Sequence, residues 1–131
     1  MTLPPAVIIH GLADARAALA PHRPVTLLSA PGAASYAGCG WWRAVVAAAL
    51  AGHPGAAVPD ALDCAGAPGR ALEALSLGCR LLVLYPCPAW AGVAGRAAAQ
   101  GASLLDRPPP ALDLGQPGAV RHLAAWLSAP P

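Results

Sequence analysis

Lysine, asparagine and phenylalanine are absent from this alanine-rich chain of 131 residues, and charged residues make up only 11% of it. Without lysine, the protein cannot form a Schiff base or supply the lysine of a phosphate-binding loop. The apolar content of 56% excludes an intrinsically disordered chain, which would be poor in apolar residues and rich in charge. The length fits a single domain, residues 1–131, that is large enough to bury a core.

Basic residues are few and scattered, and long hydrophobic runs are missing. Eight arginines stand against six acidic residues without forming a cluster, so we expect no nucleic-acid partner. The longest apolar runs, 44–51 and 81–91, are shorter than the roughly 20 residues of a membrane span. No secretory leader is visible either, so we expect a cytoplasmic protein with no membrane partner.

The four cysteines lack the spacing of a metal or redox motif. Cys39, Cys64, Cys79 and Cys87 include no Cys-x-x-Cys pair, and no histidine stands at a ligand spacing from them. We therefore expect free thiols, as is usual in the reducing cytoplasm, and no metal site. No motif in the sequence identifies a cofactor.

Short apolar runs alternate along the chain with alanine-rich segments of helical periodicity. The runs predict five strands, at residues 4–10, 25–29, 61–63, 80–85 and 102–105. The intervening segments predict helices within 12–20, 39–51, 68–78, 88–101 and from 117 onward. The run Leu-Leu-Val-Leu-Tyr at 81–85 has no polar alternation, which is typical of a strand buried on both faces of a parallel sheet.

This alternation predicts one α/β domain with a mostly parallel five-stranded sheet. Helices on both faces would make it a three-layer α/β/α sandwich, either flavodoxin-like or small Rossmann-like. The proline run at 108–110 is interpreted as a stiff, extended connector at a surface edge.

Polar residues that can bind a ligand or take part in catalysis follow the predicted strands. Parallel strands end at the same edge of a sheet, and ligands of such folds bind there. One interpretation is a binding site, and the other is that strand ends simply tolerate polar residues. The residues expected at this edge are His10, Ser29, Ser35, Tyr36, Asp63, Cys64, Arg70, Tyr85, Cys87, Asp106 and Arg107.

The small-residue loop at 29–40 would let backbone amides approach an anion in front of a helix N-terminus. It lacks the Gly-x-Gly-x-x-Gly motif of dinucleotide-binding sites, so the alternative is an ordinary surface loop. We interpret the protein as a non-catalytic module that binds a small anionic ligand or a protein. The residues expected to bind the ligand are His10, Ser29, Ser35, Tyr36, Asp63 and Tyr85.

The segment Cys64-Ala-Gly-Ala-Pro-Gly-Arg70 resembles the Cys, five residues, Arg loop of cysteine-dependent phosphatases. The resemblance implies a Cys64 thiolate that attacks phosphorus, with Arg70 and the loop amides holding the oxygens and Asp106 as the acid. His10 is the base that the predicted edge would bring to Cys64. The loop departs from the family, because Asp63 replaces a histidine found in the larger phosphatases. The alternative is that Cys64 packs as a small buried side chain.

Adjacent tryptophans, Trp41 and Trp42, lie in the predicted helix 39–51. Neighbouring residues on a helix point about 100° apart, so both cannot face the sheet. One interpretation is that one of them contacts a partner, which predicts a homodimer through this helix. The other is that the helix is covered on two sides, so that both tryptophans are buried in the core.

Overall fold

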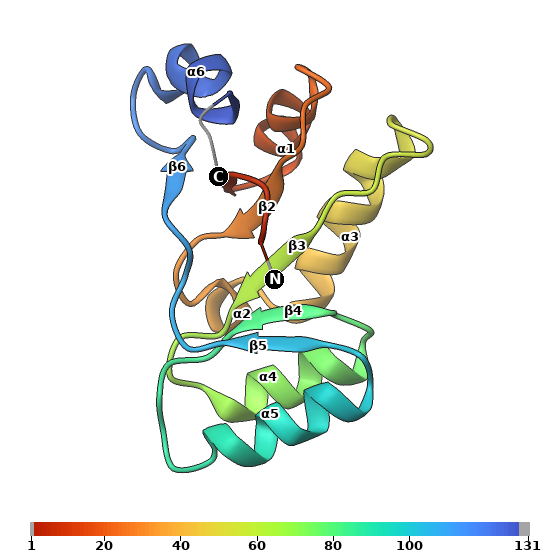
Figure 1. Cartoon of the computed structure of the whole chain (residues 1–131), viewed down its shortest axis with the longest axis vertical. Coiled ribbons are helices and arrows are strands. Elements are labelled where there is room, and N and C mark those ends of the chain that lie inside the picture. Colours follow the sequence, from red (N-terminus) through yellow and green to blue (C-terminus); the bar gives the residue numbers. More distant parts are fainter. Residues whose placement is uncertain (1, 129–131) are drawn as a thin grey trace.

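The computed structural model of the protein describes residues 2–128, and it contains a single six-stranded sheet within them. The strand order is β5-β4-β3-β2-β1-β6, and every neighbouring pair is parallel (Figure 1). The strands are β1 (Ala6–Ile9), β2 (Thr26–Ser29), β3 (Asp60–Asp63), β4 (Leu81–Val83), β5 (Ser103–Leu105) and β6 (Ala111–Asp113). The predicted α/β class, parallel sheet and Rossmann-like alternation are confirmed.

The helices follow the predicted segments closely. They are α1 (Leu12–Leu19), α2 (Ala33–Tyr36), α3 (Cys39–Ala51), α4 (Pro68–Ser76), α5 (Trp90–Ala99), the 3-10 turn η1 (Ala119–His122) and α6 (Leu123–Leu127). Proline opens α4, where its missing N–H costs nothing, and Gly78 follows the helix with a left-handed φ of 87°. The short helix α2 lies within the segment that the sequence suggested was a loop.

The sheet has six strands, so the expectation of five was wrong. The additional strand, β6, follows the proline run directly and pairs with β1 in parallel, with Ala6 opposite Ala111. Three residues next to a proline run give no periodic signal of their own. Their extended conformation depends on hydrogen bonds to β1, more than a hundred residues earlier in the chain, as in the 3.1 Å bond from the Leu114 amide to the Ile8 carbonyl.

Every helix that packs on the sheet within residues 2–128 lies on one face. The main core joins alternate strand residues, such as Ile9 and Leu62, to the inner sides of α1, α3, α4, α5 and α6. The handedness of the connections explains this, because β1 to β5 follow one another across the sheet in one direction. Right-handed crossovers that all step the same way fall on the same face. The described helices therefore form one layer, whereas the sequence predicted a helix layer on each face of the sheet.

A smaller apolar cluster covers the opposite face, and no helix residue belongs to it in the part of the chain described. Its buried members come from the strands, and Leu3 of the N-terminal segment packs on it. The return from β5 to β6 joins the two edges of the sheet through residues 106–110 without a helix. In Figure 1 this connector runs from β5 to β6 on the side away from α3. On the second face, irregular chain therefore packs on the strands through Leu3, in place of a helix.

Candidate functional site

The carboxyl ends of β2 and β3 are joined by a buried hydrogen-bond network. The Ser29 hydroxyl accepts a bond of 2.8 Å from the Asp63 amide and donates to the Ala30 carbonyl at 3.1 Å. The carboxylate of Asp63 accepts through Oδ1 from the amides of Gly32, at 3.2 Å, and Ala65, at 2.8 Å. Both Ser29 and Asp63 are only 1% exposed. The structure therefore brings these two predicted site residues together.

The carboxylate of Asp63 takes the place of a bound anion beside the loop at 29–40, which was predicted to bind one through its backbone amides. Amides that would hold a ligand's oxygens already bond to Asp63, whose negative charge also repels an anion. The other oxygen, Oδ2, is buried without a hydrogen-bond partner among the described residues. Burial raises the pKa of Asp63, and the two amide bonds oppose that rise. This part of the edge is built to hold two loops together.

The Cys64 thiol lies in the core. The residue is 0% exposed, and its sulfur lies 3.9 Å from the carbonyl oxygen of Leu62. Burial, together with nearby Cys39 and Asp63, raises the pKa of the Cys64 thiol to about 12. A nucleophilic thiol needs an accessible setting that favours the thiolate near neutral pH, so this setting does not favour the phosphatase reaction.

Several other polar groups of the phosphatase-like loop make hydrogen bonds within the protein. The amides of Cys64, Ala67 and Arg70 all donate to backbone carbonyls, and that of Ala65 donates to Asp63. The Arg70 guanidinium donates to Glu73 at 3.2 Å on the exposed side of α4. Four of the loop amides and the arginine are therefore already paired within the protein, and do not form a free set of donors around the thiol.

His10 pairs with a residue outside the predicted site. Its Nε2 lies 2.6 Å from Oδ1 of Asp113, at the end of the neighbouring strand β6. The turn after β6 leaves room for the ring only because residue 115 is glycine, where a Cβ would lie 2.6 Å from that nitrogen. Since β2 separates β1 from β3, His10 and Cys64 follow strands that are not neighbours.

The other predicted residues are spread along the edge. Ser35 and Tyr36 lie on α2 and are exposed, Tyr36 by 69%. Tyr85 follows β4, and burial together with the Asp63 charge raises the pKa of its phenol. Asp106 contacts its neighbour Arg107 at 3.3 Å in an exposed pair. None of these side chains lines the pockets described within residues 2–128.

The tryptophan pair of α3 is taken largely into the core. Trp42 is 0% exposed and donates through Nε1 to Oδ1 of Asp60 at 3.1 Å, while Trp41 is half-buried against the same core. The outward positions of α3 include Ala44, Ala47 and Ala48. The helix therefore offers small side chains to solvent.

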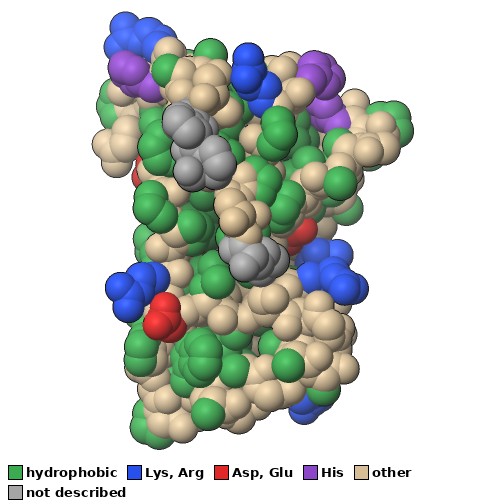
Figure 2. Space-filling model, viewed as in Figure 1, with side chains coloured by type: hydrophobic (Ala, Val, Ile, Leu, Met, Phe, Trp, Pro, Cys, Tyr) green, Lys and Arg blue, Asp and Glu red, His purple; other side chains and the backbone are tan. Residues whose placement is uncertain are grey.

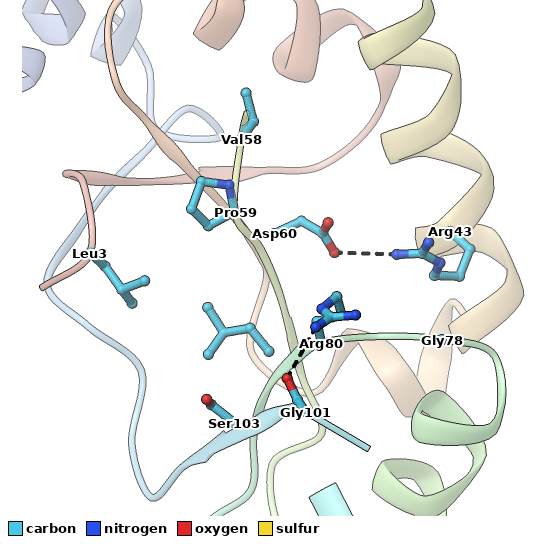
Figure 3. Close-up of a pocket in the computed structure, with 10 residues that line it drawn as sticks. Leu3, Arg43, Val58, Pro59, Asp60, Gly78, Arg80, Gly101 and Ser103 are labelled. Atoms are coloured by element: carbon cyan, nitrogen blue, oxygen red, sulfur yellow. Dashed lines mark hydrogen bonds and ion pairs between the residues drawn. The ribbon is translucent and has the colours of Figure 1, made fainter. Parts of the chain in front are cut away.

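A pocket of about 400 Å³ lies at the opposite edge of the sheet, where β3, β4 and β5 begin. Arg43 reaches it from α3, and Figure 3 shows its guanidinium extending toward Asp60, 3.7 Å away. Arg80 borders the same space and donates to the Gly101 carbonyl at 3.3 Å. The apolar side chains of Leu3, Val58, Pro59 and Leu81 also line the pocket.

The chemistry of this pocket suits an anion with an apolar body. Its lining has two guanidinium groups, on Arg43 and Arg80, against one carboxylate, on Asp60, which leaves one positive charge. Burial raises the pKa of Asp60, while Trp42 and Arg43 oppose that rise. A size of a few hundred Å³, an apolar wall and a few directed polar groups are typical of small-molecule sites.

Sequence reasoning missed this pocket because its members carry no motif. Arg43 and Arg80 lie 37 positions apart (80 minus 43), one inside α3 and the other just before β4, so in the sequence they are two isolated charges. Asp60 stood just outside the predicted third strand. An arginine inside the otherwise apolar helix 39–51 was the available signal, because a charge there needs a partner.

Comparison with known proteins assigns no family to the chain. Neither the protein-family models nor the curated proteins contain a match to it. Of the helices in residues 2–128, none combines the length and apolar character needed to cross a membrane.

Proposed function

We propose that the protein is a non-catalytic module that binds a small organic anion in the pocket between Arg43 and Arg80. The observation that carries the proposal is that two guanidinium groups and several apolar side chains line the same cavity. The ligand class is a monocarboxylate or a phosphate ester with a short apolar body.

Electrostatics favours this edge over the carboxyl edge. At the carboxyl edge, Asp63 already holds the amides of Gly32 and Ala65, and it adds negative charge. In the pocket, the 3.7 Å separation between Arg43 and Asp60 is longer than a direct hydrogen bond, so the guanidinium keeps donors for a ligand. Arginine matches carboxylate and phosphate oxygens with two parallel bonds.

The proposal does not extend to catalysis by Cys64. Its buried thiol, with a pKa of about 12, would have to ionise and become exposed before it could attack a substrate. Self-association through α3 stays a separate prediction, which sedimentation of the wild-type protein would test.

The binding proposal is tested with matched charged and neutral probes. Benzoate, hexanoate and phenyl phosphate should raise the melting temperature and give a measurable affinity by calorimetry, whereas benzyl alcohol should not. Arg80→Gln should weaken benzoate binding by about tenfold, because one charge-assisted hydrogen bond is lost. Arg43→Gln should act in the same direction.

An exposed arginine elsewhere provides the control. Arg96, in the last turn of α5, does not line the pocket, so Arg96→Gln should leave benzoate affinity unchanged. Because Arg43 also contacts Asp60, circular dichroism must show that each variant is folded. Equal loss in all three variants, or equal binding of benzoate and benzyl alcohol, would contradict the proposal.

A further inference from the structure

Two histidines that lie 31 positions apart in the sequence meet at the amino-terminal edge of the sheet. The rings of His22 and His53 have centroids 5.3 Å apart and planes tilted by 50°. Both residues line two adjoining pockets of about 310 and 360 Å³. Figure 2 shows histidine side chains at two places on this face, one of which is near the ends of α1 and α3.

The ends of two neighbouring helices present this pair. His22 follows the end of α1 by three residues, and its amide bonds to the Leu19 carbonyl; His53 follows α3 by two, bonding to Leu50. The two helices pack against each other and run the same way, since each leads from the carboxyl edge back to the amino edge. Helix C-termini carry a partial negative charge, so two side by side favour a bound cation.

The separation of the rings fits a shared metal ion. Two imidazoles that bind one tetrahedral ion through bonds of about 2.0–2.1 Å have centroids roughly 5 Å apart. The 50° tilt shows that the two rings are not stacked parallel to each other. His22 also has a left-handed φ of 56°, a conformation that few residues other than glycine adopt.

We propose that His22 and His53 bind a divalent transition-metal ion of the imidazole-preferring class, Cu²⁺, Ni²⁺ or Zn²⁺. The residues described include no group of three or more histidine, cysteine or acidic side chains around a point, so water fills the remaining positions. The adjoining pockets leave space for that water. Arg23 lines one pocket and opposes the ion's charge, whereas the helix ends and both imidazoles favour it.

The order of affinities is set by the ligands. Neutral imidazoles without thiolates or carboxylates should bind Cu²⁺ more tightly than Ni²⁺ or Zn²⁺. Titration calorimetry with Cu²⁺ in a non-chelating buffer should therefore give one site per chain. Electron paramagnetic resonance of the Cu²⁺ form should show hyperfine coupling to two nitrogens.

The variants are chosen to keep the fold. His22→Asn removes the imidazole but tolerates the left-handed conformation, and His53→Gln keeps a polar side chain of similar size. Each should weaken Cu²⁺ binding by about tenfold or more, because a chelating pair becomes a single ligand. Arg23→Ala should strengthen binding.

A histidine near the C-terminal end of the described chain serves as the control. His122 is exposed in η1, and His122→Gln should leave the affinity and the spectrum unchanged. Wild-type affinity in folded His22→Asn or His53→Gln, or coupling to a single nitrogen in the wild type, would overturn the proposal.

Discussion

His10 and Asp113 join the carboxyl ends of β1 and β6 through a contact of 2.6 Å between Nε2 and Oδ1. The two side chains are 42% and 30% exposed. Asp113 also accepts from the Gly115 amide at 2.8 Å, so it holds both the ring and the turn that follows β6. The pair fastens the last strand to the first.

Acid should weaken this link. Burial raises the pKa of Asp113, but bonds from His10 and Gly115 outweigh it and bring the net pKa below the ordinary value of 3.8. A carboxyl whose pKa is lowered by folding stabilises the protein above the unfolded pKa, and this contribution is lost as pH falls through the folded pKa. For a partly exposed pair we expect about 0.5–1 kcal/mol.

Urea unfolding of wild type and Asp113→Asn measures that contribution. The difference in unfolding free energy should be present at about pH 6 and should shrink toward about pH 2. A difference that stays constant across this range would show that Asp113 acts through its shape alone.

Gly115→Ala should lower stability by about 0.5–1 kcal/mol, because the new methyl group must displace the His10 ring and so break its contact with Asp113. An ideal Cβ there lies 2.6 Å from Nε2 of His10 and 3.1 Å from Oδ1 of Asp113. Gly95→Ala is the matched control, since Gly95 lies inside α5 with open space around its Cβ position. That change should raise stability by about 0.5–1 kcal/mol through helix propensity. Thermal melts of both variants give the comparison, and similar shifts in both would refute the steric argument.

Asp63 should show the opposite pH dependence. Because burial raises its folded-state pKa, this group favours the folded state most when protonated, and stability falls as pH rises above its ordinary value of 3.8. Asp63→Asn should remove this slope and be at least as stable as wild type at neutral pH. Asp63→Ala should cost about 1–3 kcal/mol, since the amides of Gly32 and Ala65 lose their acceptor. Denaturant titrations across pH would test both, and an unchanged slope in Asp63→Asn would be inconsistent with this account.

Alkylation should distinguish the four thiols. Cys87 is partly exposed, whereas Cys39, Cys64 and Cys79 are buried. Burial raises the pKa of both Cys39 and Cys64 to about 12. Iodoacetamide near neutral pH should therefore label Cys87 first in the native protein and all four thiols in denaturant, as mass spectrometry would show. Rapid labelling of native Cys64 would instead support the thiol hydrolase alternative.

The fold class could be predicted because its signals are local. Apolar runs such as 81–85 and proline or glycine boundaries such as Pro68 and Gly78 identify each element without reference to the others. The sixth strand could not be identified in this way, since Ala111, Leu112 and Asp113 become a strand only beside β1. The face of the sheet on which the helices lie also depends on the strand order, and no local sequence pattern determines that order.

The candidate sites were harder to predict for a related reason. Sequence reasoning placed Ser29 and Asp63 correctly at one edge, but burial decides what they do there. Whether a carboxylate faces solvent or takes up the amides around it depends on how two loops pack. Likewise, Arg43 with Arg80, and His22 with His53, are brought near one another only by the order of the strands.

The pairing of β6 with β1 has a consequence for synthesis on the ribosome. Residue 6 emerges about a hundred residues before its partner at 111, so the nascent chain carries β1 with one unsatisfied side while the other four crossovers assemble. A chain that stalls before the proline run would keep that side open, and strands of other polypeptides could add to it. Pairing of residues 111–113 thus covers the edge of β1 that β2 leaves open.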